Sequence, residues 1–301
     1  INKPMKIIEC VPNFSEGRNQ HTVEILVQAL KKVPDVRLLD ASADADHNRC
    51  VLTLMASPGR IIEGVMAVAE EALRWIDMRS HKGIHPRIGA VDVVPFIPLG
   101  EATMAEAVEV AHRFGHEFAQ KTGVPIFFYG EAALKPERRQ LPDVRRGGYE
   151  GLAARMKDPQ WHPDAGEAVF NDRWGATAVG ARIPLVAFNV NLDSTDLTLA
   201  RDIACAVRES SGGFPCVKAI GLFLASRNKI QVSMNLTDYR KTSLRTVFDL
   251  IEKMARARGV RVLHSELIGL LPRDALADAT PEYLKLFDFS AERIIESHFQ
   301  E

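Results

Sequence analysis

Residues 185–192, LVAFNVNL, begin the run of segments that decides the fold. Apolar and amide side chains alternate along this segment, and a period of two predicts a β-strand. Strand patterns return at 217–224, 230–236 and 260–267, and helical spacing occupies 197–209 and 243–258. A turn at 226–228 joins the second and third strands as a hairpin. The resulting order, βαββαβ, is that of the ferredoxin-like split βαβ unit.

The first half of the chain carries a similar series. Strand patterns lie at 6–12, 36–39, 50–55, 91–99 and 124–129, and helical patterns at 23–30, 61–76 and 104–120. We therefore predict an α/β (α+β) protein with two ferredoxin-like-type subdomains, residues 1–183 and 184–301. Each subdomain is expected to be a mixed β-sheet with helices packed on one face.

A stretch of different character, residues 135–182, precedes the second series and is rich in Gly, Pro, Arg and Asp. We predict a helix within 142–156 and a long loop over 157–180, and loops of that length are often functional. Beyond the last strand, 276–287 and 291–298 are predicted to be terminal helical pieces.

Composition and charge restrict the class of protein. The 301 residues, roughly two domains of ~150, are 46% hydrophobic and 26% charged, which excludes a disordered chain. Thirty-eight basic residues balance 39 acidic ones, so bulk charge gives no support for nucleic-acid binding. The four cysteines are widely spaced, and no apolar run reaches the ~18 residues of a membrane span. We expect a soluble, cytoplasmic protein with no disulfide scaffold and no membrane partner.

The densest polar cluster is RSHKGIHPRIG, residues 79–89. Its glycines and proline keep it out of regular structure, so a shaped loop is predicted. Histidine titrates at ~6.5 when unperturbed, which suits proton transfer, and the adjacent Lys82 and Arg87 suit an anionic substrate. A metal pair of His81 and His85 is disfavoured, because the loop is not helical and no Glu follows His81. The alternative is a solvated basic loop.

Two turns near the N-terminus carry weaker signals. Residues 10–17 join the first strand to the first helix, where backbone N–H groups and Asn13 can form an anion site. Ordinary turn and capping chemistry explains the same residues. The acidic turn at 40–49 lacks the central glycine and final glutamate of an EF-hand. Its last residues, HNR (47–49), stand at a strand entrance and are candidates to face a cleft.

Amide side chains follow one face of two strands in the second half. Asn189 and Asn191 share a face of the first strand, and Gln231, Ser233 and Asn235 share a face of the third. They form either an ordinary wet sheet face or a polar groove for a ligand rich in amides and carboxylates.

The segment FNDRWG, residues 170–175, lies in the long loop between the halves. Its aromatic residues either stack on a flat heteroaromatic ligand or anchor the loop onto the core. The sequence contains no dinucleotide-binding glycine motif, Walker loop or Gly-x-Ser-x-Gly elbow.

Seven blocks of sequence, in order, are shared with one known family. They are ECVPNFSEG (9–17), HKGIHPR (81–87), YGEAA (129–133), WGATA (174–178), AFNVNL (187–192), QVSMNL (231–236) and LIGLLP (267–272). With these blocks the chain resembles the formiminotransferase family, the folate-dependent glutamate formimidoyltransferases, over nearly its whole length.

The resemblance implies transfer of a formimino group between N5 of tetrahydrofolate, a co-substrate, and the amino group of glutamate, in histidine degradation and one-carbon metabolism. It places the catalytic histidine at His85, which would shuttle a proton between the substrate amine and N5. It implies no metal or redox cofactor, and it implies a homodimer. For the carboxylates and pterin we assign the loop and strand-face residues Lys82, Arg87, Asn13, Asn189, Asn191 and Asn235.

The family's folate-binding stretches align with residues 166–175 and 212–221. The residues assigned to folate binding are Gly166, Phe170, Arg173, Trp174, Gly175, Gly212, Val217, Ile220 and Gly221. In the second stretch Phe214-Pro215 replaces a more basic pattern. Ser42 stands where animal relatives have a second acidic residue, although Asp40 is kept. Asp40, Asp44 or a water would then take over any role of that acid.

Two alternatives to this function stay open. The first is a sibling activity on 5-formyltetrahydrofolate, such as ATP-dependent cyclisation, which the lack of a nucleotide motif disfavours. The second is a folate-binding module without catalysis, which an intact His85 with its cationic neighbours disfavours. Some family members are fused to a cyclodeaminase; here we expect a separate cyclodeaminase. Two roles stay open for His81, namely assisting His85 and shaping the loop.

Overall fold

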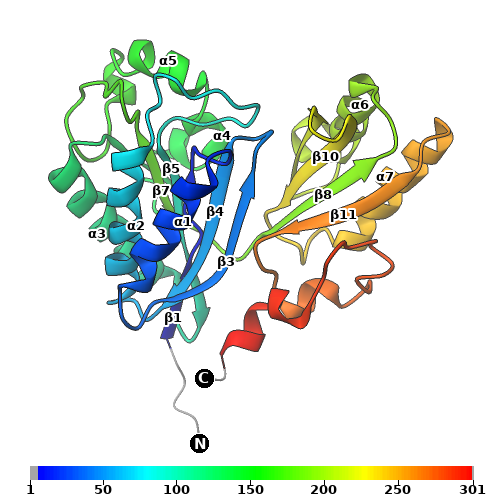
Figure 1. The fold of residues 1–301 in the computed structure, drawn as a ribbon, viewed down its shortest axis with the longest axis horizontal. Coiled ribbons are helices and arrows are strands. Elements are labelled where there is room, and N and C mark those ends of the chain that lie inside the picture. The colour runs from blue at the N-terminus through cyan, green and yellow to red at the C-terminus, as the bar shows by residue number, and fades with distance from the viewer. Residues whose placement is uncertain (1–5, 300–301) are drawn as a thin grey trace, which may run out of the picture. The chain divides into compact units, whose positions relative to one another are not determined.

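The computed structural model describes residues 6–299 and divides into two compact units, Ile1–Arg182 and Ile183–Glu301 (Figure 1). Each unit has its own β-sheet and its own hydrophobic core. The prediction of an α/β fold built from two subdomains is therefore confirmed. Within the described residues, no helix is both long and apolar enough to cross a membrane.

The first unit contains a seven-stranded sheet. Two short segments, β1 and β2, occupy successive parts of the central position between β4 and β5, while β3 extends one edge and β7 and β6 the other. Pairings of β7 with β5 and β6 are parallel and the remaining ones antiparallel, so the sheet is mixed, as predicted. The strands are β1 (Lys6–Cys10), β2 (Asn13–Phe14), β3 (Arg37–Asp44), β4 (Arg49–Ala56), β5 (Val91–Gly100), β6 (Ile126–Gly130) and β7 (Thr177–Ala181).

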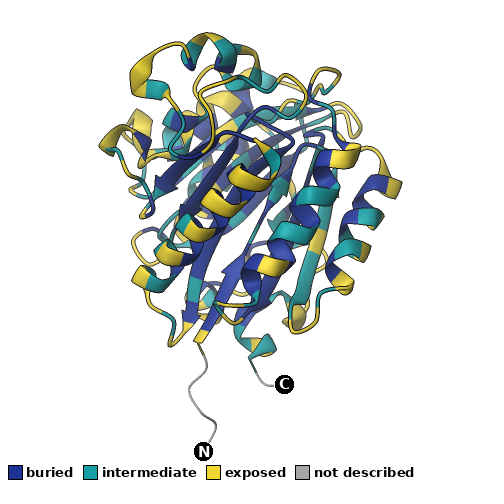
Figure 2. Cartoon of the chain, turned by 90° about the vertical axis from the view of Figure 1, so that its left-hand side faces the viewer, coloured by how far each residue is buried: buried dark blue, intermediate teal, exposed yellow. Residues whose placement is uncertain are grey.

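Three helices cover one face of this sheet: α1 (Gln20–Lys31), α2 (Ile61–Trp75) and α3 (Met104–Thr122). Their inner stripes are buried and their outer sides are exposed (Figure 2). They pack on alternate strand residues such as Phe96 and Phe128, all fully buried in one core. Such alternation follows from the period of two along a strand.

The opposite face is also covered, at the end formed by β5, β7 and β6. There α4 (Leu141–Val144) and α5 (Gly148–Arg155) contribute to a second cluster with Phe127 and Tyr129. The expectation that helices pack on only one face of the sheet was therefore wrong for this part of the first unit. The physical reason is that β6 is apolar on both faces, so each face needs a packing partner.

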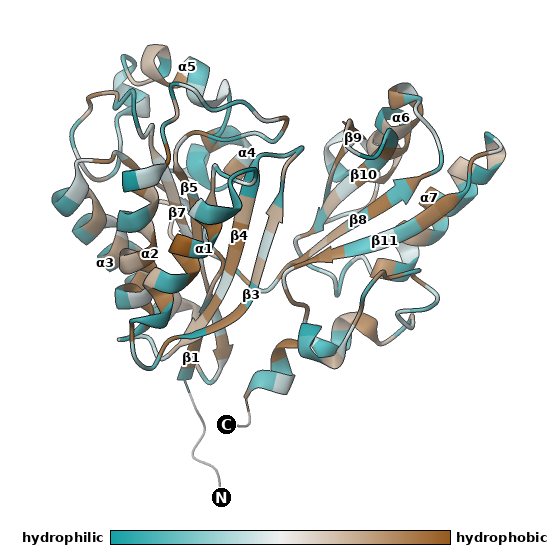
Figure 3. Cartoon of the chain, in the orientation of Figure 1, coloured by the Kyte–Doolittle hydropathy of each residue, from teal (hydrophilic) through white to brown (hydrophobic). Residues whose placement is uncertain are grey.

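The second unit has a four-stranded sheet in the order β11-β8-β10-β9. Helices α6 (Leu197–Val207) and α7 (Leu244–Ala257) cover one face. In Figure 3, β11 carries a hydrophilic stretch, whereas β4 of the first unit is hydrophobic. All pairings are antiparallel, which corrects the expectation of a mixed sheet, because the split βαβ order inserts an antiparallel strand between parallel ones. The strands are β8 (Val186–Leu192), β9 (Val217–Leu224), β10 (Lys229–Leu236) and β11 (Val262–Ile268).

Two further expectations differ from the structure. Strand β7 lies inside the predicted long loop. Residues 276–287 form turns rather than a helix, because Pro281 interrupts the segment and Lys285 adopts a left-handed φ of 51°. Short 3-10 helices, Ala291–Arg293 and Ile295–His298, do occur in the predicted final piece.

Candidate functional site

The loop at residues 79–89 lies against the turn that enters β4. Asn48 connects three segments: its Oδ1 accepts from the Gly17 N–H at 3.0 Å, and its Nδ2 donates to the Lys82 carbonyl at 2.9 Å. Gly83 approaches the His47 carbonyl so closely that a Cβ would overlap it. The loop is therefore shaped by specific contacts. A tight cavity lies at this junction, lined by Phe14, Ser15, His47, Asn48, Arg49, His81, His85, Arg87 and Asp92.

His85 is half-buried in this cavity and both of its ring nitrogens have partners. Nδ1 lies 2.8 Å from the Pro86 carbonyl, and Nε2 lies 2.5 Å from Nη1 of Arg49. Because arginine only donates, Nε2 must accept, so the proton is assigned to Nδ1, which donates to the carbonyl. Burial, followed by the charges of Arg49 and Arg145, holds the pKa of His85 well below 6.5. The imidazole is therefore a neutral base.

Two arginines and one carboxylate surround the imidazole. Arg145 pairs with Asp92, whose other carboxylate oxygen accepts from the Ile88 N–H at 2.8 Å. Arg49 makes no ion pair within residues 6–299. Burial, and then repulsion from Arg145, lower the pKa of Arg49 to about 10, so it remains charged at neutral pH. The surroundings of the cavity consequently carry an excess of positive charge, but its volume of about 10 Å³ admits an anionic group only if the lining side chains move apart.

Arg87 is engaged within the protein. Its guanidinium donates to both carboxylate oxygens of Glu150, at 2.6 and 3.0 Å, and its Nε donates to Nδ1 of His81 at 3.2 Å. Nε2 of His81 in turn lies 3.0 Å from the Asn48 carbonyl, which makes this nitrogen the donor. Lys82, in contrast, is exposed, and its ammonium has no partner among the described residues.

The junction after β1 uses its polar groups for internal bonds. The amide of Asn13 donates to the Val11 carbonyl at 2.7 Å, and the hydroxyl of Ser15 donates to the Gly89 carbonyl at 2.7 Å. On the edge strand β3, Ser42 donates to Oδ2 of Asp40 at 2.5 Å. The contacts of Asn13 match the turn interpretation of this junction.

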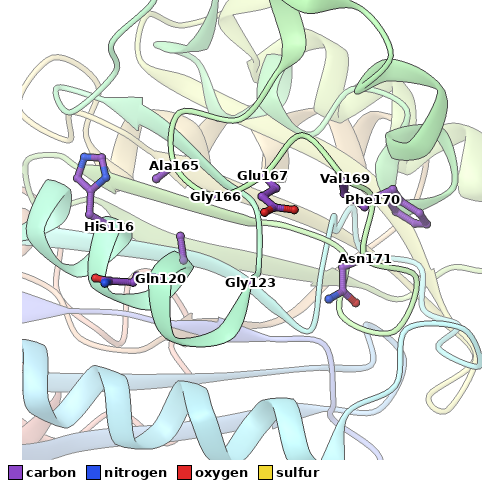
Figure 4. A pocket seen from close by; sticks show the side chains of 10 residues that line it. His116, Gln120, Gly123, Ala165, Gly166, Glu167, Val169, Phe170 and Asn171 are labelled. Atoms are coloured by element: carbon purple, nitrogen blue, oxygen red, sulfur yellow. The ribbon is translucent and has the colours of Figure 1, made fainter.

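The first predicted folate stretch divides between two environments. Gly166 and Phe170 line a surface pocket of about 640 Å³ beside α3, together with His116, Gln120, Glu167 and Asn171 (Figure 4). The indole of Trp174 points elsewhere, donating to the Leu73 carbonyl at 2.7 Å and packing on the core. Gly175 forms a β-bridge with Gly89, and Arg173 donates to the Arg74 carbonyl at 3.2 Å. Trp174 thus anchors the loop.

Tyr149 connects the loop of residues 166–175 to the loop of residues 79–89, which we call the histidine loop. Its ring lies 5.5 Å from that of Phe170, and its hydroxyl donates to the Asp172 carbonyl. Its backbone N–H donates to the Arg87 carbonyl at 2.8 Å. The two loops, which carry half of the predicted site residues, are therefore coupled through α5.

The second predicted folate stretch does not gather at one surface. Val217 is buried in the core beneath the helices, and Gly221 lies against the backbone of α6. Ile220, between them, is 36% exposed on the opposite face. Gly212 ends a 3-10 helix with a φ of 86°. Alternation along β9 separates these side chains.

The amide-rich strands are neighbours in the second sheet. Asn191 is paired with Gln231 and Asn189 with Ser233, on the face away from the helices, and Gln231 donates to Asn191 at 3.0 Å. Asn235 lies further along the same face and is exposed. From β11 the face also receives His264 and Glu266, which sequence reasoning missed.

The first unit contains two further missed residues, Asp92 and Glu150, while Arg145 belongs to a basic cluster of the sequence that suits either a small polyanion or solvent. An acid inside the apolar segment VDVVPF (91–96) was the available signal for Asp92. Glu150 gave none, and the pairing of Arg145 with Asp92 could not be predicted, because the partners of both residues are more than fifty residues away. Within residues 6–299, no group of three or more metal-binding side chains is arranged to hold a metal ion.

Comparisons with known proteins point to one family. The model of the formiminotransferase domain, N-terminal subdomain, matches residues 7–182, and that of the formiminotransferase domain matches residues 187–298. A glutamate formimidoyltransferase from Streptococcus pyogenes serotype M1 is 45% identical over 97% of this chain and 98% of its own. One from Thermoplasma acidophilum is 39% identical over 97% of both chains. The formimidoyltransferase-cyclodeaminase of Gallus gallus is 43% identical over 93% of this chain, which spans 53% of that protein.

Proposed function

The chain belongs to the formiminotransferase family and is a transferase, and from this premise we propose that it transfers a formimino group between N-formimino-L-glutamate and tetrahydrofolate. The observation that carries this proposal is the neutral imidazole of His85 beside the cations Arg49 and Arg145. A base and an anion-binding charge in one cavity suit an acidic substrate whose nitrogen must exchange protons.

The proposed reaction moves one proton through His85. As N5 of tetrahydrofolate bonds to the formimino carbon, Nε2 removes the N5 proton. The bond between that carbon and the glutamate nitrogen then breaks, and Nε2 returns the proton to the departing nitrogen. Such acid–base catalysis contributes ~10²–10⁴-fold to a rate. Holding both substrates together contributes through effective molarity.

Folate binding is proposed for the first unit's pocket. Phe170 contributes an aromatic side chain to its lining and Gly166 a residue without a side chain, which suits a flat pterin. Trp174 and Gly175 would support this loop, since they contact the protein's own core and backbone. The exposed ammonium of Lys82 and the amide face with Asn189 and Asn191 are proposed to hold carboxylates. We also propose a cytoplasmic homodimer.

The test is an assay of the purified chain with tetrahydrofolate and N-formimino-L-glutamate, without added metal. His85→Ala should lower turnover by at least ~10²-fold while the Kd for tetrahydrofolate changes little. His21→Ala, an exposed histidine on α1, is the matched control. Equal turnover in His85→Ala would remove its role. Folate binding without product would instead favour the binding module, and turnover of 5-formyltetrahydrofolate with ATP the cyclising alternative.

A further inference from the structure

We propose that Arg49 is the specificity-determining residue for the amino-acid substrate: it binds the α-carboxylate, and by doing so releases Nε2 of His85 for the substrate nitrogen. This inference rests on the proposed function. It specifies how the amino-acid substrate of that reaction is recognised.

The charge balance leaves Arg49 available. Asp92, the nearest carboxylate to the cavity, is already paired with Arg145 and accepts from the Ile88 N–H. Asp44 lies opposite Arg49 in the strand register, but its Oδ1 accepts from the His47 N–H at 2.7 Å. Arg49 instead donates to a neutral imidazole, that of His85.

A carboxylate is a better partner for Arg49 than the imidazole. Charge-assisted, bidentate hydrogen bonds between arginine and a carboxylate are roughly twice as strong as neutral ones. Little space separates Arg49 from His85, whose atoms lie 2.5 Å apart, so an entering carboxylate must part the two groups. The imidazole stays in place, because Nδ1 is held by the Pro86 carbonyl.

The geometry of an α-amino acid fits this pair. The nitrogen and the carboxylate carbon are both bonded to Cα, so a carboxylate on Arg49 places the nitrogen beside Nε2 of His85. Arg87 is a weaker candidate for this role, because Glu150 occupies both of its terminal nitrogens. Lys82 is exposed and remains suited to the more distant side-chain carboxylate.

The release should be visible in the titration of His85. The groups that face or surround its imidazole are Arg49 from β4, His47 from the preceding turn, Asp92 from β5, Arg145 after α4, and His81 and Arg87 from its own loop. Neutralising Arg49 with a carboxylate removes the nearest cation, so the pKa of His85 should rise when an N-acylated α-amino acid, whose nitrogen is uncharged, binds.

The first experiment compares N-formimino-L-glutamate with its α-carboxamide analogue. The unmodified chain should prefer the carboxylate by about 10–100-fold in kcat/KM, the range for a lost hydrogen bond to a charged group. Arg49→Gln should lose that preference by slowing only the carboxylate substrate. Arg256→Gln, an exposed arginine of α7 paired with Glu252, should leave both rates unchanged. Equal slowing of both substrates by Arg49→Gln would overturn the proposal.

The second experiment needs no turnover. Ring ¹⁵N chemical shifts of His85, assigned with His85→Gln, are titrated against pH with and without N-acetyl-L-glutamate, whose nitrogen is uncharged. N-acetyl-L-glutamate should raise the pKa of His85 in the unmodified chain but not in Arg49→Gln, and N-acetyl-L-isoglutamine, which lacks the α-carboxylate, should not raise it. An unchanged titration with N-acetyl-L-glutamate would overturn the role of Arg49. A chain that shows this response but makes no formimino-folate would contradict the proposed function alone.

Discussion

Both carboxylate oxygens of Glu150 accept hydrogen bonds from the guanidinium of Arg87, which ties the histidine loop to α5. The backbone reinforces this tie, since the Arg87 carbonyl accepts from the Tyr149 N–H at 2.8 Å. Arg87 was assigned to a substrate carboxylate because it is a cation in the histidine loop. In the structure its charge is compensated by a protein carboxylate, so positioning of the loop is the role that its contacts support.

Glu150→Gln should loosen this loop at a small cost in stability. The Glu150 side chain is 65% exposed, so the pair contributes no more than about 1 kcal/mol. The bond to Arg87 lowers the pKa of Glu150 below 4.5, so the stabilisation is present above that pH and lost as the carboxylate protonates. Hydrogen exchange at the Tyr149 amide should accelerate at pH 7 and approach that of the unmodified chain as pH falls below the lowered pKa of Glu150. Glu117→Gln, which breaks an exposed helical pair, is the control, and similar exchange in both variants would refute the tie.

The pH dependence of the proposed reaction follows from the environment of His85. Its pKa is held well below 6.5, so the base stays neutral at cellular pH and is lost only as pH falls through that lowered value. The acid limb of kcat/KM, which reports the free enzyme, should therefore have its midpoint below 6.5. If the substrate carboxylate takes Arg49, the limb of kcat should lie at higher pH. A midpoint of kcat/KM at or above 6.5 would argue against His85 as the base.

The fold was largely predictable from the sequence because its core strands alternate. Residues 186–192 place Phe188 and Val190 under the helices and the amides on the other face, as their spacing indicates. Strand β7 was missed because all five of its residues are buried, so the alternation that reveals a one-sided strand is absent.

The site was predictable only in part, because its contacts join distant segments. The composition of residues 79–89 marked the loop, but nothing in the sequence indicates that Arg49 meets His85 across 36 positions. In the same way, the sequence pattern of Trp174 does not show that its N–H is used by the Leu73 carbonyl. Residue types indicate chemistry, whereas the choice of partner depends on tertiary packing.

The buried ion pair between Arg138 and Asp164 should be important for stability. The two side chains are 1% and 3% exposed, and Arg138 also donates to the carbonyls of Gln160 and His162, at 2.9 and 2.6 Å. Asp164→Asn leaves a buried cation without its counter-charge, which typically costs about 3–5 kcal/mol. Denaturant unfolding measures this loss.

A neighbouring pair provides the matched control. Arg139 and Glu131 are both about half exposed, so Glu131→Gln should change the free energy of unfolding by less than about 1 kcal/mol. Equal effects of Glu131→Gln and Asp164→Asn would show that burial does not set the contribution of the Arg138–Asp164 pair to the free energy of unfolding. A double replacement of Arg138 and Asp164 by leucine should recover part of the loss, because no lone charge then remains.

The close contact between Gly175 and the histidine loop gives a test of backbone coupling. Gly175 has a φ of 68°, and a Cβ there would overlap the Ile88 carbonyl oxygen. Gly123, at the end of α3, has a φ of 72°, and a Cβ there would meet no atom within 4 Å. Alanine at either position therefore meets the same left-handed backbone, at about 1–2 kcal/mol, but only Gly175→Ala adds an overlap with backbone. We expect Gly175→Ala to destabilise the protein by clearly more than Gly123→Ala in denaturant unfolding.

Because the bridge joins Gly175 to Gly89, the displaced loop should also shift the titration of His85 toward 6.5. Equal stabilities of the two variants, with an unchanged His85 titration, would show that the two loops are not coupled at this contact.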